Sequence, residues 1–260
     1  MIINLTTQSE EFIPKKTSKN NQKQHNLKYL NFFAMTFVTC LLTSNVLGPI
    51  PINVFGLILP GGGLLFPLSF LLDNIITEVY GYKHSRAIIW YAIICHGIMA
   101  FFFTLTALIP STLPYEEITA FRKILFLSPV VFSASLISII ISQHLNSMVL
   151  SKMKRSKLIN DLLFLRCLSS TLVAVTVDSL IFVPIIFSNR LTSLQLIYMI
   201  ICTYVVKVVY EFVFYPVTKS VIYSLKTKEG IDVIDFDTSY TPFSLDISYT
   251  EKELIGNFSK

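Results

Sequence analysis

Long apolar runs alternate with short polar breaks along most of the chain, from Leu27 to Tyr223. Most of these runs approach the roughly 20 residues that an α-helix needs to cross about 30 Å of hydrocarbon. The pattern therefore predicts an all-α membrane protein with six transmembrane helices. The expected spans are Leu27–Val46, Leu64–Tyr80, Ala87–Ile109, Ile124–Val149, Leu162–Phe187 and Leu194–Tyr223.

The second of these spans follows a break in the helical pattern. An apolar, glycine-rich stretch begins at Val54, and Pro60 is followed by three glycines, Gly61–Gly63. Irregular backbone inside a membrane is tolerated only where protein or water covers it. The stretch is either a broken or re-entrant segment, as at many transporter substrate sites, or an external loop that returns to the membrane.

Composition and charge support a membrane protein and predict its orientation. Of the 260 residues, 53% are hydrophobic and only 14% are charged, against about 25% charged in soluble domains. Lys and Arg gather in the N-terminal tail, near Lys83, near Lys154 and after Lys219, whereas the opposite loops hold only Arg122, Lys123 and Arg190. The positive-inside rule then places both termini in the cytoplasm, and it explains the net charge of +5 without a nucleic-acid partner.

These features predict three regions. Residues 1–26 form a disordered, basic cytoplasmic tail, residues 27–225 the six-helix transmembrane domain, and residues 226–260 a cytoplasmic C-terminal tail. No short apolar core with a cleavage site precedes the first span, so we expect that span to be retained.

Four ionisable side chains lie near the middles of predicted spans: Asp73, Asp178, Lys207 and Glu211. Each charge at the centre of a membrane helix costs about 2.5–3.5 kcal/mol on insertion scales. These groups must face the bundle interior, pair, titrate or line water. Lys207 and Glu211 are four residues apart, so we predict an ion pair, which either locks the span or leaves Lys207 facing a ligand as well.

Other polar residues are harder to assign from spacing. Thr171 and Asp178 fall on one helix face with Ser170 close by, which gives either a polar stripe for a ligand or the hydroxyl packing common in membrane bundles. Asp73 and Glu78 are about 140° apart around a helix, so they do not form one carboxylate pair. Glu78 is near Lys83 and Arg86, where a solvated ion pair and a functional role are both open.

Cysteines and histidines indicate no metal site and no cofactor. Cys40, Cys95, Cys167 and Cys202 lie singly in four apolar runs, as buried cysteines used as small apolar fillers do. His96 and His144 are also isolated, and we interpret both as packing residues rather than proton relays.

Several motifs together resemble the queuosine precursor transporters, also called the vitamin uptake transporter family. They are TSN at Thr43–Asn45, FPLSFLLDNIITEVYG at Phe66–Gly81 with the following Arg86, SSTLVAVTVDSLIF at Ser169–Phe182, KVVYEFVFYPVT at Lys207–Thr218 and KEGIDVIDFDTSYTPF at Lys228–Phe243. The resemblance implies six spans in the bacterial cytoplasmic (inner) membrane. It also implies import of 7-deazaguanine bases, such as preQ0, preQ1 or queuine, for tRNA modification.

The resemblance points to Asn45, Asp73, Asp178 and Lys207 as substrate-binding residues. Supporting residues would be Asn74, Glu78, Arg86, Ser170, Thr171 and Glu211. One carboxylate can accept both the ring N–H and the adjacent amino group of such a base in a fork, while Lys207 or Asn45 donates to its carbonyl oxygen. We expect at least one of Asp73 and Asp178 to bind the base in this way, and Asp73 either holds the base or exchanges a proton during transport. The expected partners are a small purine-like base and the lipid bilayer, and the oligomeric state is open.

Two other functions compete with this prediction. One is a substrate-binding subunit of an ATP-driven vitamin uptake system, although the first span has no clear small-x-x-x-small run for docking to a partner. The other is an intramembrane hydrolase. The chain has no G-x-S-x-G and no H-E-x-x-H, so we expect that it is not an enzyme.

Overall fold

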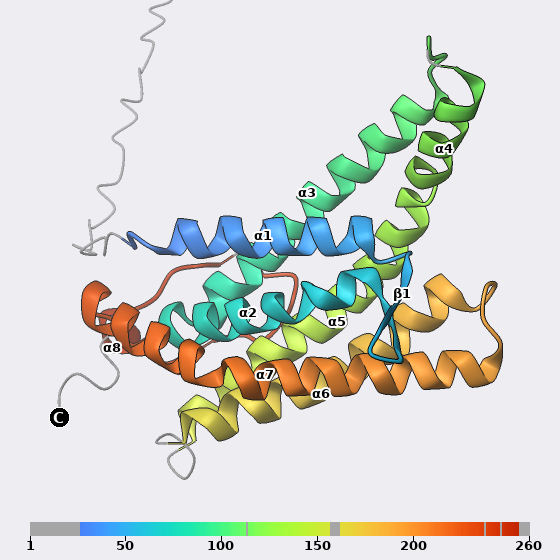
Figure 1. The fold of residues 1–260 in the computed structure, drawn as a ribbon. Helices are drawn as coiled ribbons and strands as arrows, with labels where there is room; N and C mark the ends of the chain where they lie inside the picture. The colour runs from blue at the N-terminus through green and yellow to red at the C-terminus, as the bar shows by residue number, and fades with distance from the viewer. Residues whose placement is uncertain (1–26, 113, 157–161, 237, 245, 255–260) are drawn as a thin grey trace, which may run out of the picture.

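The protein is described by a computed structural model that covers residues 27–112, 114–156, 162–236, 238–244 and 246–254. The predicted disordered tail, residues 1–26, lies outside the described residues. Figure 1 shows the fold, an assembly of long helices around the short helix α2. The elements are α1 (Leu30–Leu47), β1 (Pro51–Val54), β2 (Leu57–Pro60), η1 (Gly61–Leu64), α2 (Phe66–Tyr80), α3 (Tyr82–Leu108), α4 (Tyr115–Leu125), α5 (Ser128–Arg155), α6 (Leu163–Phe187), α7 (Ser193–Glu229) and α8 (Glu251–Leu254).

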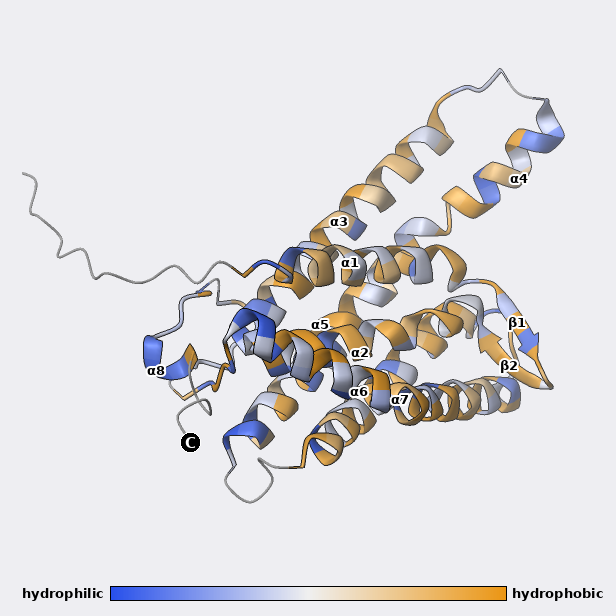
Figure 2. Cartoon of the chain, turned by 60° about the vertical axis from the view of Figure 1, so that its left-hand side comes forward, coloured by the Kyte–Doolittle hydropathy of each residue, from blue (hydrophilic) through white to orange (hydrophobic). Residues whose placement is uncertain are grey.

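Within the described residues, five helical stretches are long and apolar enough to cross a membrane. Four of them are the helices α1, α3, α6 and α7, and the fifth is Tyr115–Arg155, which contains α4 and α5. Figure 2 shows hydrophobic residues along these helices and hydrophilic residues around α8 and on α4. The prediction of a multi-pass, mainly helical membrane protein is confirmed. The remaining predicted span, the second in the chain at Leu64–Tyr80, corresponds to α2, which has only 15 residues, so six spans and cytoplasmic termini stay predictions.

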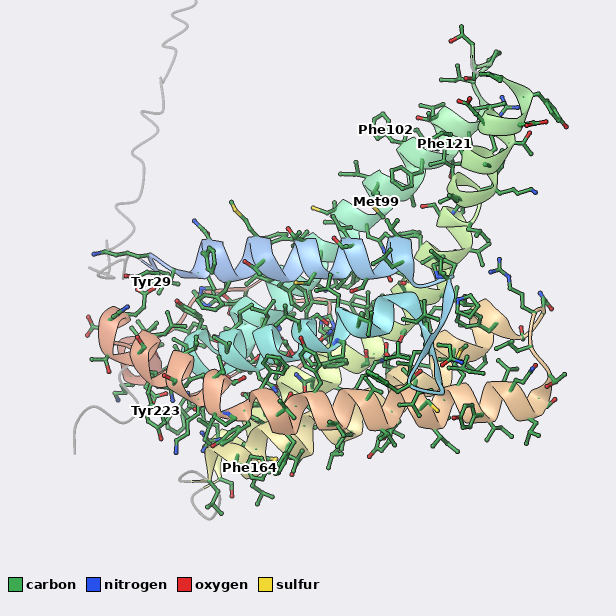
Figure 3. All side chains as sticks on the ribbon, in the orientation of Figure 1. Tyr29, Met99, Phe102, Phe121, Phe164 and Tyr223 are labelled. Atoms are coloured by element: carbon green, nitrogen blue, oxygen red, sulfur yellow. The ribbon has the colours of Figure 1, made fainter. Side chains whose placement is uncertain are left out.

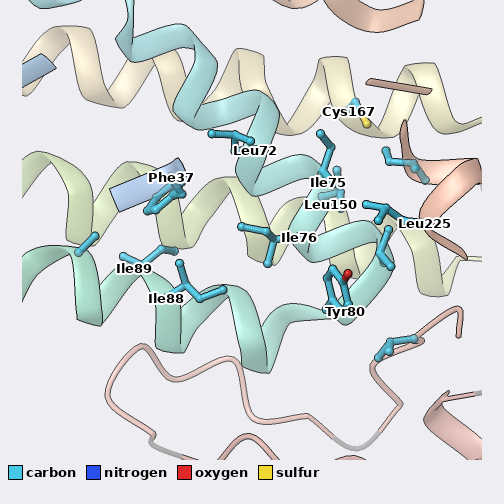
Figure 4. Packing of buried hydrophobic residues seen from close by; sticks show 14 of the residues in the cluster. Phe37, Leu72, Ile75, Ile76, Tyr80, Ile88, Ile89, Leu150, Cys167 and Leu225 are labelled. Atoms are coloured by element: carbon cyan, nitrogen blue, oxygen red, sulfur yellow. The ribbon is translucent and has the colours of Figure 1, made fainter. Parts of the chain in front are cut away.

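Helix α2 is the interior element of the fold. It packs against α1, α3, α5 and α7, and nearly all of its side chains are buried. Its apolar residues meet those of the surrounding helices in the core, as Figure 4 shows for Leu72, Ile75 and Ile76. Because protein surrounds it on all sides, α2 can carry carboxylates and amides that lipid would not tolerate.

The predicted break before α2 is confirmed, and it adds a hairpin to an otherwise helical fold. Strands β1 and β2 pair antiparallel through a turn in which Phe55 and Gly56 have φ of 52° and 88°, the positive values of a tight hairpin turn. The 3₁₀ turn η1 then packs on α1, where a Cβ on Gly62 would lie 2.1 Å from the carbonyl oxygen of Ser44. Only glycine allows this approach at position 62. A re-entrant position in the bilayer stays a prediction.

The chain after α7 folds back onto the bundle. Helix α7 continues past the predicted start of the tail at residue 226 and ends at Glu229, and Gly230, with a left-handed φ of 66°, caps it. The following segment lies beside the end of α2 and the start of α3, where Val233 N donates to the carbonyl of Val79. At Gly81, φ is 84° and an added Cβ would lie 2.4 Å from Tyr249 Oη. The C-terminal segment, meaning the described residues within 230–254, is therefore packed against the α2–α3 corner.

Candidate functional site

Asp178 and Lys207 form a buried ion pair between two neighbouring helices. Lys207 Nζ on α7 donates to Asp178 Oδ2 on α6, and Ser138 Oγ on α5 donates to Asp178 Oδ1 at 2.5 Å. The ammonium also lies 4.7 Å from the ring centre of Phe66, within the range of a cation–π contact. A cation, a carboxylate and an aromatic face thus meet at one point.

These groups line a small cavity, here called the Asp178 cavity. It encloses about 30 Å³, and its walls include Ser44, Asn45, Gly62, Phe66, Asp178 and Lys207. Such a volume has room for one or two water molecules. The hairpin and η1 close one side, so the irregular segment before α2 forms part of the site.

Asn45 lies at the edge of the Asp178 cavity in a hydrogen-bonded chain of its own. Its Nδ2 donates to His96 Nδ1 at 3.2 Å, and Ser135 Oγ donates to its Oδ1 at 2.6 Å. The structure therefore brings together three of the four predicted substrate-binding residues, Asn45, Asp178 and Lys207. It also gives His96 a polar contact that the prediction of a packing residue missed.

Asp73 belongs to a separate polar network. Its carboxylate accepts hydrogen bonds from Ser85 Oγ, from Asn146 Nδ2 at 2.7 Å and from Ser147 Oγ at 2.9 Å, while Thr77 Oγ1 lies 3.4 Å away. In the described part of the chain, no Lys or Arg lies within ion-pair distance of it. Asp73 is therefore a deeply buried carboxylate satisfied by neutral groups alone.

Asn74 links this network to Glu211. Asn74 Nδ2 donates to Thr171 Oγ1 and to Glu211 Oε1, both at 3.1 Å, and Asn74 Oδ1 accepts from Asn146 at 3.0 Å. The predicted ion pair between Lys207 and Glu211 is wrong. Lys207 finds a carboxylate on the adjacent helix α6, and Glu211 is held by the amide on α2.

Ser170 and Thr171 contact the second network rather than Asp178. Thr171 binds Asn74 directly, and Ser170 Oγ lies 3.5 Å from Asn74 Oδ1. The shared helix face of Thr171 and Asp178 is confirmed by the burial of both side chains, but the two residues serve different polar clusters along that face.

Glu78 is the centre of a third, ionic cluster. Its carboxylate is fully buried and lies 2.8 Å from Arg166 Nη2, 2.7 Å from Lys226 Nζ and 3.7 Å from Lys154 Nζ. The alternative of a solvated ion pair between Glu78 and Lys83 or Arg86 is therefore excluded. Four helices and the C-terminal segment meet here, because Asp232 also pairs with Lys154 at 2.6 Å and with Lys226 at 2.8 Å.

The side chain of Arg86 binds backbone carbonyl groups of the C-terminal segment. The guanidinium donates to the carbonyl oxygens of Ser239 at 3.0 Å, Thr241 at 3.1 Å and Asp246 at 2.6 Å. Asp235 supports the same segment by accepting from Tyr82 N at 3.1 Å. The structure thus gives Arg86 a structural contact away from the Asp178 cavity.

Several polar residues of the site were not predicted from the sequence, and most lie on α5. Ser135, Ser138, Ser142 and Asn146 are buried and spaced three or four residues apart, which places them on one helix face. This stripe of polar residues within an apolar run is the sequence feature from which they could have been predicted.

Among the described residues, no group of three His, Cys, Asp or Glu side chains is arranged to hold a metal ion.

The Asp178 cavity offers hydrogen-bond acceptors on Asp178, donors on Lys207 and Asn45, and the ring of Phe66, all within protein. Such a set suits a small planar molecule with both donors and acceptors on its edge.

Comparison with known proteins gives two matches. Residues 60–221 match the family described as "Putative vitamin uptake transporter". A protein of Bacillus subtilis (strain 168), "Probable queuosine precursor transporter", is 27% identical over 162 residues, which cover 60% of this chain and 68% of the relative. No solved structure matches. The family match includes Asp73, Asp178 and Lys207, whereas Asn45 and the C-terminal segment lie outside it.

Proposed function

Because the chain belongs to the vitamin uptake transporter family, we propose that it imports a 7-deazaguanine queuosine precursor through the Asp178 cavity. The chain is a multi-pass membrane protein of a transporter family, and the relative is described as a "Probable queuosine precursor transporter". The membrane would be the inner membrane of a bacterium. The observation that carries the proposal is the buried Asp178–Lys207 pair at the cavity wall.

The hydrogen-bonding edge of a 7-deazaguanine fits these groups. Its ring N–H and exocyclic amino group present two adjacent donors, which one carboxylate accepts in a fork. Asp178 would take this role, and Lys207 or Asn45 would donate to the neighbouring carbonyl oxygen. Phe66 would stack on the ring face.

In the described state the ion pair occupies the place of the substrate. Lys207 donates to the same carboxylate that the base would bind, and the cavity of about 30 Å³ is too small for a purine-like ring. We propose that the base enters between the two side chains. Lys207 then exchanges its bond to Asp178 for one to the carbonyl of the base, so that neither charge is left without a partner.

Asp73 and Glu211 would couple transport to protons. Both carboxylates are buried, at 1% and 2% exposure, and within the described residues neither forms a salt bridge. An ionised carboxylate without a cation is costly in such a place, so protonation is its natural alternative. Asn146 on α5 donates to both Asp73 and Asn74, and Asn74 donates to Thr171 on α6 and to Glu211 on α7. This chain of hydrogen bonds gives a protonation change a path to the helices around the cavity.

The proposal is tested by restoring queuosine in tRNA. A bacterial host that cannot make or import precursors is supplied with this gene and with preQ0, preQ1 or queuine, each in a separate culture. We expect queuosine with at least one base, and loss of it with Asp178→Asn at equal expression. No queuosine with any base would refute the substrate class. If transport is found only when an ATPase module copurifies with the chain, the chain is instead a substrate-binding subunit.

A further inference from the structure

A second, larger cavity lies beside the Asp178 cavity and shares Asn45 with it. This lateral cavity encloses about 410 Å³ between α1, α3 and the α4–α5 junction, and its walls include Asn45, His96, Met99, Phe103, Val131 and Arg190. In Figure 3 the upper part of α3, where Met99 is labelled, leans away from α1. The cavity lies near the C-terminal end of α1, which the charge pattern predicts to face the outside.

The size and lining of the lateral cavity suit a small planar ligand. Ligand pockets commonly enclose about 300–1,000 Å³ and are mainly apolar with a few polar groups. The thioether of Met99 and the ring of Phe103 offer surfaces for a flat ring. Arg190 lies at the rim, where it donates to the carbonyl of Pro49 at 3.2 Å.

His96 supplies a free donor to this cavity. Ser135 donates to Asn45 Oδ1, so the amide nitrogen of Asn45 is the donor to His96 Nδ1. A neutral imidazole that accepts at Nδ1 carries its proton on Nε2. That nitrogen is buried and has no hydrogen-bond partner in the described part of the structure. His96 as a whole is only 1% exposed.

We propose that the lateral cavity is an entry site for the transported base, with Asn45 and His96 as the partition between it and the Asp178 cavity. This inference rests on the proposed function. His96 Nε2 donates to an acceptor on the edge of the base, while Met99 and Phe103 cover its face. Asn45 borders both cavities, so when it releases His96 the base can pass to Asp178 without leaving the protein.

The test uses cysteine labelling on the full-length protein in proteoliposomes. Cys95, the exposed native cysteine among the four, is first changed to serine. Met99→Cys then places a thiol in the lateral cavity. Phe102→Cys, on the same helix but outside the cavity lining, is the matched control. A water-soluble, membrane-impermeant maleimide is added with and without preQ1 or queuine, and base uptake is measured afterwards.

We expect the maleimide to label Met99→Cys and to abolish uptake, and we expect the base to slow this labelling severalfold. For Phe102→Cys, the base should not change the rate of labelling, and uptake should persist after the maleimide treatment. As a second variant, His96→Leu should raise the KM of uptake about 2- to 10-fold, the cost of one hydrogen bond to a neutral donor, and it should weaken the protection of Met99→Cys by the base.

Failure of this inference is distinguishable from failure of the proposed function. If the purified protein binds a base in an Asp178-dependent manner, but the base does not protect Met99→Cys and labelling leaves uptake intact, the entry site is refuted and the Asp178 site stands. If Asp178→Asn leaves base binding unchanged, the proposed site itself is wrong. Absence of labelling at Met99→Cys would show that water does not reach the lateral cavity, and this would also refute the entry site.

Discussion

Lys207 on α7 donates a hydrogen bond to Asp178 on α6, so the two opposite charges of the Asp178 cavity come from neighbouring helices. A pair within one helix would stabilise that helix alone. A pair between helices changes when α6 and α7 move relative to each other, and a ligand that separates the two groups acts on both helices at once.

The first prediction concerns this pair. Asp178→Asn replaces one accepting oxygen with a donor, so an N–H of the base faces an N–H. The loss of a hydrogen bond to a charged group costs about 1.5–3 kcal/mol, roughly 10- to 150-fold in affinity. Equilibrium binding of the base to purified protein measures this loss, which should be present at every pH tested.

A double variant separates substrate binding from folding. Asp178→Asn alone leaves Lys207 buried without its carboxylate, which should lower expression, because breaking a buried ion pair costs about 3–5 kcal/mol. Asp178→Asn with Lys207→Met removes both charges and should restore expression but not transport. Full transport by the double variant would show that the pair is only structural.

The second prediction concerns Asp73. Asp73→Asn keeps the size of the side chain but removes the group that we propose to take up protons. Base binding should stay within about twofold of the wild type, whereas uptake should lose its dependence on pH between about 5 and 8. Uptake in proteoliposomes with an imposed pH gradient measures this, and an unchanged pH profile would exclude Asp73 as a coupling residue.

The third prediction uses two adjacent glycines as a matched pair. A Cβ on Gly62 would lie 2.1 Å from the carbonyl oxygen of Ser44, whereas one on Gly63 would meet its nearest atom, Pro60 Cδ, at 3.9 Å. Gly62→Ala should therefore push η1 away from α1 and lower the thermal midpoint and transport. Gly63→Ala should leave both near wild type. Equal effects of the two variants would contradict the close approach at Gly62.

The fourth prediction concerns the pH dependence of the C-terminal segment. Burial raises the pKa of Asp232, but the ammonium groups of Lys154 and Lys226 outweigh it, so the pKa of this carboxyl lies below its ordinary value. A lowered folded-state pKa stabilises the fold above the unfolded-state pKa of about 4, and this contribution is lost as pH falls below that value.

Asp232→Asn should therefore lower the thermal midpoint at neutral pH, and the difference from wild type should shrink under acid conditions. Asp246→Asn is the control, because the Asp246 side chain is 55% exposed and its ion pair with Lys83 spans 3.5 Å. This control should change the midpoint little at any pH. A pH-independent difference for Asp232→Asn would mean that the Asp232 ion pairs do not hold the segment.

The fifth prediction is the orientation. Reporter fusions after Lys260 and in the loop before α4, at Pro114, should show opposite sidedness, with the C-terminal reporter in the cytoplasm. The reason is the excess of Lys and Arg on the predicted cytoplasmic side. Reporters on the same side would overturn the six-span topology.

The sequence predicted the apolar helices, the break before α2 and the buried positions of Asp178 and Lys207, because hydrophobic length and isolated charges leave few alternatives in a membrane. The sequence did not predict which charged side chains pair with each other. Lys207 has Glu211 one turn away on its own helix, yet it binds Asp178, and only the packing of α6 on α7 decides between them. The Glu78 cluster was missed for the same reason, since Lys154, Arg166 and Lys226 lie far along the chain and meet Glu78 only after assembly.

The burial of α2 also sets an order for biosynthesis. Its polar residues Asp73, Asn74 and Glu78 find their hydrogen-bond and ionic partners outside α2 later in the chain, on α3, α5, α6 and α7. When α2 leaves the ribosome it is a short segment with two carboxylates and none of these partners, so insertion into lipid at that moment is unfavourable. It must wait beside the translocon, or in the headgroup region, until α5 to α7 have been made. Chains truncated after α3 should therefore leave α2 accessible to water, and the site near it is completed only when the last helix arrives.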